Sequence, residues 1–368
     1  MKHKEIFKFI ENWAPLEIAW EKDNPGLQIG STEEITKGIV LSLDITDDVI
    51  EFAKKEKCNL IISHHPLIFF PIKSLNFSDY KNSLIRDLIN NDITIYSAHT
   101  NLDFTKNGVS FALAKKLGLE KITFLENAPQ TQFKLVTFVP EQNVRDLINR
   151  LSEAGAGVIG DYTHCSYKLH GKGTFFGQEN TSPRVGMKGR LEEVDEIRLE
   201  MIFEKWKLNR IIRTLLSNHP YEEPAYDIYP LMNRNVNYGY GAKGFLKKKL
   251  PLSKFVELVK KNLKSRVVKF SEGNKKYVAK IAVCGGSGSD LIQKAISEGC
   301  DAFVTSDIKY HSFLDYGKSI ALIDAGHYYT EIPILEELEK RLKEFISSQK
   351  EKIKIVKFLQ KAIIKFVE

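Results

Sequence analysis

The sequence predicts an α/β protein of more than one domain, in which a discontinuous parent with mixed, mostly parallel sheets carries an inserted α+β domain. Short apolar runs alternate with helical patterns at both ends of the chain, and this alternation is typical of βαβ units. The pattern changes near residue 126 and resumes after residue 240. The length of 368 residues also exceeds what one hydrophobic core usually supports.

The first 125 residues show the alternation most clearly. Apolar runs predict strands over 38–44, 59–62 and 93–96, and apolar residues at helical spacing predict helices over 47–57, 79–90 and 108–117. In parallel sheets of this kind, ligands collect at the carboxyl ends of the strands. Residues that follow 62 and 96 are therefore the first candidates for function.

Residues 126–239 follow a different order of elements. Strands are predicted over 133–138, 163–171, 198–203 and 226–231, with one helix that begins at Val144 and another over 208–216. This β-α-β, β-α-β order is that of a ferredoxin-like sandwich. We interpret 126–239 as a domain inserted into a parent formed by 1–125 and 240–368.

The α/β pattern resumes after residue 240. Strands are predicted over 278–283, 302–305 and 320–323, and helices over 254–263, 290–298 and 331–345. Between 346 and 368, lysines recur at helical spacing beside an apolar face, which predicts a basic amphipathic helix. Such a helix could lie on a membrane surface or pack in an oligomer, and we favour packing. Six lysines and two glutamates give this segment +4 of the net +7 charge.

Composition excludes several classes of protein. Hydrophobic residues make up 43% and charged residues 27%, which argues against disorder. The four cysteines form no CxxC pair, so we expect neither a zinc ribbon nor a disulfide scaffold. No apolar run approaches the ~18 residues of a transmembrane segment, and we expect a cytoplasmic protein. No basic-aromatic stripe indicates nucleic-acid binding.

Histidines and carboxylates follow two of the predicted strands. His64 and His65 come directly after the strand over 59–62, while His99 and Asp103 follow the strand over 93–96. Each motif alone could be a polar turn that caps backbone groups. Because parallel strands end at one sheet edge, their joint occurrence indicates a cluster at that edge.

A third motif follows the strand over 320–323. His327 and Glu331 would share one helix face if the helix begins early, whereas Thr330 could instead be the N-cap of a later start. A hydrogen-bonded pair at a helix end is the simpler interpretation of this motif alone. Together, the three motifs supply neutral imidazoles and carboxylates that suit zinc, manganese or iron(II). Five such ligands fit two ions that share a bridging carboxylate and water.

These motifs resemble the family of GTP cyclohydrolase 1 type 2 homologues, which are NGG-interacting-factor-like proteins with a dinuclear metal centre. The resemblance includes the sequence HHP at 64–66, AHTNLD at 98–103, DAGHYYTE at 324–331, Trp20 with NPGLQ at 24–28, CGGSGSD at 284–290 and DAFVTSDIKYH at 301–311. In the insert, HPYEEPAY at 219–226 resembles the PII- or CutA-like domain of the longer members.

The resemblance implies an NGG-interacting-factor-like fold, a toroidal homohexamer and two divalent metal ions per subunit. The implied ligands are His64, His65, Asp103, His327 and Glu331. The implied activity is hydrolytic opening of a purine nucleotide, GTP, by metal-bound hydroxide with release of formate. His99 would orient a ligand or shuttle a proton, and His311 would be a further acid or base.

Other features leave alternatives open. The Gly-rich segment 285–288 could hold a phosphate through backbone amides or form a tight strand-to-helix turn. His164, His170 and His219 of the insert are interpreted as surface or core residues. A second functional hypothesis is a non-catalytic metal-binding or sensing assembly in which the insert is regulatory.

Overall fold

The computed structural model of the chain describes residues 1–129, 131–160 and 162–360. The chain divides into two compact units: Met1–Glu126 with Tyr238–Glu368, called here the parent unit, and Asn127–Asn237, called the insert unit. Within the described ranges, every helix is too short or too polar to cross a membrane.

The first sheet of the parent unit has five strands in the order β1-β4-β3-β2-β15. Its strands are β1 (Gly26–Ile29), β2 (Gly38–Ser42), β3 (Leu60–Ser63), β4 (Thr94–Ser97) and β15 (Lys354–Lys357). All pairings are parallel except that of β1 with β4. One face packs on α1 (His3–Trp13) and α12 (Ile334–Ser348), and the other packs on α2 (Asp47–Lys55) and α3 (Tyr80–Asn90).

The second sheet of the parent unit has six strands in the order β11-β14-β13-β12-β10-β5. They are β5 (Glu120–Asn127), β10 (Gly239–Pro251), β11 (Lys269–Phe270), β12 (Tyr277–Ser287), β13 (Ala302–Ser306) and β14 (Ala321–Asp324). The central strands β12, β13 and β14 are parallel. One face packs on α5 (Val109–Lys116) and α8 (Leu252–Leu263), and the other on α9 (Ile292–Ser297) and α10 (Tyr310–Tyr316).

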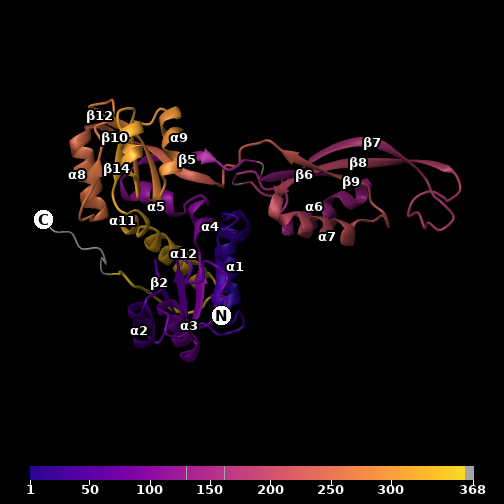
Figure 1. The fold of residues 1–368 in the computed structure, drawn as a ribbon. Helices are drawn as coiled ribbons and strands as arrows, with labels where there is room; N and C mark the ends of the chain where they lie inside the picture. Colours follow the sequence, from indigo (N-terminus) through magenta and orange to yellow (C-terminus); the bar gives the residue numbers. More distant parts are fainter. Residues whose placement is uncertain (130, 161, 361–368) are drawn as a thin grey trace. The chain divides into compact units, whose positions relative to one another are not determined.

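Helix α5 belongs to both cores of the parent unit. Val109 and Ala112 pack with the first sheet, whereas Phe111 and Leu113 pack with the second. A helix buried on opposite sides fixes two sheets against each other, because each side fills its own core. In Figure 1, α5, α11 (His327–Glu331) and α12 lie between the sheets of this unit. The remaining short elements are η1 (Leu16–Ile18), α4 (Thr100–Asp103) and η4 (Ser289–Leu291).

The insert unit is a four-stranded antiparallel sheet in the order β7-β8-β6-β9. Its elements are β6 (Gln132–Val139), η2 (Glu141–Asn143), α6 (Val144–Glu153), β7 (Tyr167–Phe176), β8 (Leu191–Glu204), η3 (Lys205–Lys207), α7 (Leu208–Asn218) and β9 (Tyr226–Leu231). Figure 1 shows α6 and α7 together on one face of the sheet. This topology confirms the predicted ferredoxin-like insert.

The prediction of a basic amphipathic helix over 346–368 is wrong for residues 349–360, which form no helix. Helix α12 ends at Ser348, and β15 then pairs in parallel with β2. Ile355 packs with the core beside α12, while Val356 packs with the core beside α2. The apolar side chains therefore alternate with the period of a strand, although the lysines are also compatible with helical spacing. The rest of the prediction, over 361–368, lies outside the described residues.

The structure also differs from the sequence prediction around residue 331 and at strand β10. The single helix expected over 331–345 is two helices, α11 and α12, with Pro333 between them. Proline lacks the amide hydrogen of a continuing helix, so the chain turns there. Thr330 lies inside α11 and is not its N-cap. Strand β10 was not predicted, because the lysines at 247–249 conceal its apolar pattern.

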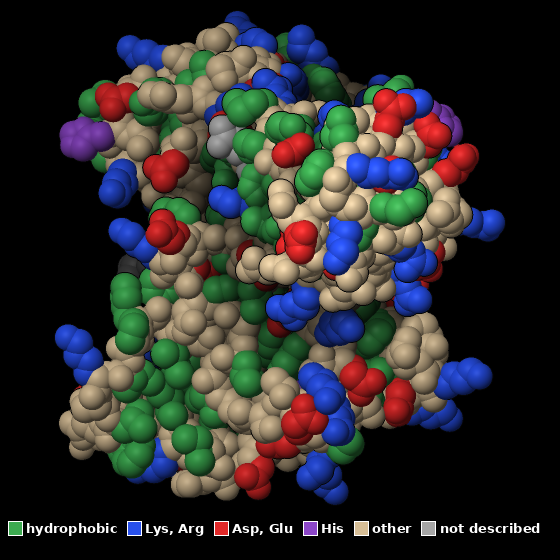
Figure 2. Space-filling model, turned by 90° about the vertical axis from the view of Figure 1, so that its right-hand side faces the viewer, with side chains coloured by type: hydrophobic (Ala, Val, Ile, Leu, Met, Phe, Trp, Pro, Cys, Tyr) green, Lys and Arg blue, Asp and Glu red, His purple; other side chains and the backbone are tan. Residues whose placement is uncertain are grey.

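Charge is dispersed over the surface. Figure 2 shows Lys and Arg side chains interspersed with Asp and Glu on the face that it displays. Many charged side chains of the described residues are paired, as in the contact of 2.6 Å between Lys343 Nζ and Glu339 Oε1. Exposed pairs of this kind contribute little to stability, and the visible face carries no broad field of one sign.

We predict that the C-terminal strand contributes to the stability of the parent unit. Replacing Ile355 with Ala should lower the free energy of unfolding by about 1–3 kcal/mol, because this partly buried side chain packs on the first sheet. The exposed Lys352→Ala variant is the control and should change it by less than about 0.5 kcal/mol. Denaturant unfolding measures the free energy of unfolding of both variants. Equal changes in the two variants would contradict a stabilising role of β15.

Candidate metal centre

The candidate centre lies between the two sheets of the parent unit. His64 and His65 follow β3, and Asp103 ends α4, which follows β4. Because β3 and β4 pair in parallel, these residues share one sheet edge, as the sequence indicates. His327 and Glu331 begin and end α11, which follows β14 of the second sheet. Both sheets therefore contribute side chains to one cluster.

The Glu331 carboxylate occupies the middle of this cluster. Its Oε1 lies 2.8 Å from His327 Nε2 and 3.8 Å from His64 Nε2, and its Oε2 lies 3.2 Å from His65 Nε2. Asp103 Oδ1 lies 3.7 Å from His64 Nε2. Only 5% of the Glu331 side chain is exposed. The structure thus brings together all five residues that the sequence proposes as metal ligands.

Each of the four imidazoles at the centre has its Nδ1 held by an oxygen. The pairs are His64 with the Ala98 carbonyl at 2.8 Å, His65 with Asp44 at 2.8 Å, His99 with Asp23 at 2.8 Å and His327 with Asp307 at 2.6 Å. These oxygens accept hydrogen bonds, so Nδ1 carries the proton of the neutral ring. Nε2 is left to bind a proton or a metal, as in metal-binding histidines generally.

The protonation of Glu331 is coupled to that of His65 and His327. Burial opposes the charged forms of Glu331 and His65, but the hydrogen bond with Asp44 and the nearby Glu331 carboxylate raise the pKa of His65 to about 10. The His327 and His65 imidazoles in turn lower the pKa of Glu331. The hydrogen bond with Glu331 is the main cause that raises the pKa of His327 to about 9. Bound protons therefore balance the buried carboxylate. A divalent cation supplies the same positive charge when it replaces them.

The donor set fits divalent cations. His64 Nε2 is buried and has no hydrogen-bond partner within the described ranges, and burial lowers the pKa of His64 to about 3. Burial, and then the charge of Glu331, raise the pKa of Asp103 well above its usual range. A neutral imidazole and two adjacent carboxylates form a site that a cation would stabilise. Among the described residues, two groups have ligand atoms within 4.8 Å of one another: His64, His65 and His99; and His65, His327 and Glu331.

His99 lies beside His64 and His65. Among the described residues, no contact links His311 to the cluster. The His99 ring centre is 5.2 Å from that of His64 and 5.4 Å from that of His65. Its partner Asp23 has a fully buried side chain that also accepts hydrogen bonds from Thr100. Burial would raise the pKa of Asp23, but these hydrogen bonds lower it to about 2. His311 is exposed on α10, where its ring contacts Tyr310.

Sequence reasoning missed the three carboxylates that orient the histidines, Asp23, Asp44 and Asp307. Asp44 comes two residues after the end of β2, and Asp307 directly follows β13. A search for polar residues at every strand end, not only those with histidines, would have found both. Asp23 lies in a loop, and no periodic pattern marks it.

The fold and the cluster together define an α/β protein with a candidate divalent-metal centre between two sheets and a ferredoxin-like insert. The chain belongs to the Duf34/NIF3 (NGG1p interacting factor 3) family, whose model matches residues 1–362.

Two relatives and one solved structure cover most of the chain. A Halalkalibacterium halodurans protein named GTP cyclohydrolase 1 type 2 homolog is 36% identical over 349 residues, which is 92% of each chain. A Bacillus subtilis protein of the same name is 35% identical over 331 residues, or 89% of each chain. The structure of a Bacillus cereus protein related to NIF3 matches with a TM-score of 0.87 and 35% identity, over 100% of this chain and 99% of that one.

We predict that the central residues determine metal content. The purified His64→Ala and Glu331→Ala variants should each lose most of the metal of the wild type, because each removes a buried side chain of the candidate centre. His311→Ala is the control and should retain it, since His311 is exposed on α10. Elemental analysis with circular dichroism to verify folding measures the effect. Unchanged metal in folded His64→Ala and Glu331→Ala would refute the site.

Proposed function

We propose that this protein is a dinuclear-metal-dependent hydrolase that opens the ring of a purine nucleotide. The observation that carries the proposal is the buried Glu331 carboxylate, whose two oxygens face different imidazoles, His327 and His65. A carboxylate placed in this way suits two ions that share it. The name of the relatives, GTP cyclohydrolase 1 type 2 homolog, supports GTP as the substrate to test.

The side chains of the centre would have different roles in this reaction. His64, His65, Asp103, His327 and Glu331 would hold two divalent ions (zinc, iron or manganese), which would polarise the group under attack and lower the pKa of a water molecule. Oxygens at Nδ1 keep three of the liganding rings in fixed orientations. His99, held by Asp23, presents Nε2 where it can accept a hydrogen bond from water or substrate.

Assembly and location are part of the same proposal. The family resemblance supports a ring-shaped homohexamer, and the residue composition supports a cytoplasmic protein that does not bind nucleic acid. A homohexamer would place six copies of the centre in one particle.

We predict that the metal-loaded protein releases formate from GTP. Glu331→Ala should lower the rate more than 100-fold, because it removes the carboxylate that both ions would share. The exposed Lys352→Ala variant is the control and should keep the wild-type rate. An enzymatic formate assay on metal-loaded protein measures the rates. A wild type that holds two ions and releases no formate from GTP or related nucleotides would contradict this activity.

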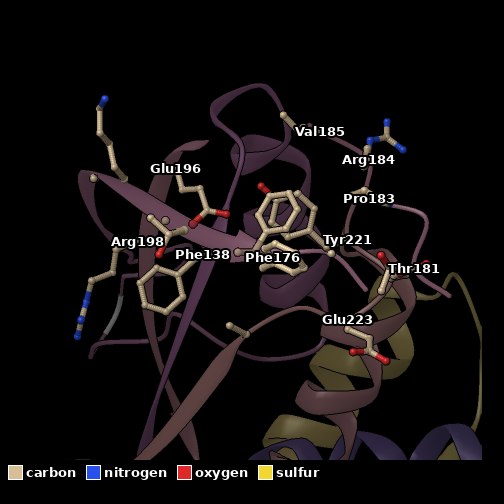
Figure 3. Close-up of a pocket in the computed structure, with 18 of the residues that line it drawn as sticks. Phe138, Phe176, Thr181, Pro183, Arg184, Val185, Glu196, Arg198, Tyr221 and Glu223 are labelled. Carbon is tan, nitrogen blue, oxygen red and sulfur yellow. The ribbon is translucent and has the colours of Figure 1, made fainter. Parts of the chain in front are cut away.

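A cavity in the insert unit favours a second candidate function, a metal-binding or sensing assembly with a regulatory insert. The cavity has a volume of about 620 Å³, which is in the range of small-molecule sites. Figure 3 shows the rings of Phe138, Phe176 and Tyr221 gathered at this cavity. Planar ligands stack on such rings.

His219 holds two of these aromatic residues in place. Its Nε2 donates to the Phe138 carbonyl at 3.1 Å, and its Nδ1 accepts from the Tyr221 amide at 3.1 Å. Burial lowers the pKa of His219, which favours the neutral ring that this pair of bonds requires. The Ser182 amide also donates to Glu222, so the two loops beside the cavity are joined. The cavity is thus built before a ligand arrives.

If the insert senses nucleotides, we predict that GTP binds to the protein in the presence of a chelator. Phe176→Ser should weaken this binding at least fivefold, because it removes one stacking ring. Leu191→Ser is a matched control: Leu191 pairs with Phe176 across β7 and β8, is similarly exposed (71% against 53%) and does not line the cavity. Isothermal titration calorimetry measures the affinities. Equal affinities of the wild type and Phe176→Ser would contradict this site.

A further inference from the structure

Only Gly288 of the Gly-rich segment 285–288 forms the expected strand-to-helix turn, because it alone lies between β12 and η4. Strand β12 continues to Ser287, which pairs with Ser306 of β13. The register shifts between Val283 and Ser287, so the strand is irregular over the glycines. Gly286 has φ +64°, a left-handed conformation that favours glycine.

The backbone of Gly286 is already engaged, which argues against a phosphate site at this residue. Its amide donates to Thr330 Oγ1 at 3.1 Å, and its carbonyl accepts from Thr305 Oγ1 at 2.9 Å. A phosphate would need amide hydrogens that have no other partner. The two threonines come from α11 and β13, so Gly286 is tied to the helix that carries His327 and Glu331.

Gly286 also lies directly against the metal centre. A Cβ added at this residue would be 2.4 Å from Glu331 Oε1 and 3.4 Å from His327 Nε2. The first separation is far below van der Waals contact, so the carboxylate would have to move. Both neighbouring atoms are the ends of side chains, which shift at a lower cost than backbone.

We propose that Gly286 is a positioning residue of the metal centre. Its lack of a side chain leaves the space in which the Glu331 carboxylate lies between His65 and His327. This inference rests on the proposed metal centre. A methyl group at 286 displaces the carboxylate from its imidazole partners, so the loss falls on metal binding more than on folding.

The test compares two glycine-to-alanine variants at positions with similar left-handed φ angles. Gly299 also has a left-handed φ, +69°, but a Cβ added there meets no atom within 4 Å. Zinc affinity is measured by competition with a chelating dye, and melting temperature is measured in excess chelator. Gly286→Ala should bind zinc at least 10-fold more weakly than the wild type, and Gly299→Ala should bind it equally well. The two variants should melt within a few degrees of each other without metal.

The outcomes separate this inference from the proposed function. A folded Gly286→Ala variant with wild-type zinc affinity would overturn the inference alone, whereas a wild type that binds no metal would overturn both. If Gly286→Ala fails to fold, adding Glu331→Asp provides the decision, because the shorter side chain withdraws the carboxylate from the new methyl group. Recovery of folding in the double variant supports the inference, and an equal failure overturns it.

Discussion

One buried carboxylate, that of Glu331, determines much of the parent unit around it. A charge removed from water is costly unless partners surround it. His327 lies on the same helix as Glu331, but the partners His64 and His65 follow β3 of the other sheet. Both sheets must therefore meet at their carboxyl ends. Helix α5 makes this possible, because its opposite sides fill the cores of the two sheets.

Residues behind the histidines fix the orientation of the imidazole rings at the centre. Asp44 and Asp307 hold His65 and His327 by Nδ1, and the Ala98 carbonyl holds His64 in the same way. Asp307 itself has a left-handed backbone, φ +57°, at the end of β13. Strain of this kind persists where the surrounding structure fixes it. These contacts leave the Nε2 atoms of His64, His65 and His327 facing Glu331, so the side chains that would hold a cation are already oriented toward one another.

Features that depend on neighbouring residues could be predicted from the sequence, whereas strand pairings between distant segments could not. The βαβ alternation, the ferredoxin-like order of the insert and the one-face placement of His327 and Glu331 all depend on neighbouring residues, and the structure has each of them. The separation of the parent strands into two sheets depends on pairings between distant segments, such as β2 with β15. Lysines at helical spacing concealed the strand character of β15. His311 belongs to one of the motifs and is exposed on α10, so its expected role as an acid or base stays a prediction.

The proposed dinuclear centre can be tested by measuring how many divalent ions each chain retains. Wild-type protein would be loaded with zinc, iron(II) or manganese, freed of weakly bound ions by gel filtration, and measured by inductively coupled plasma mass spectrometry against protein concentration. We expect two ions per chain, because Glu331 faces imidazoles through both of its oxygens. No retained ion with any of the three metals would contradict it.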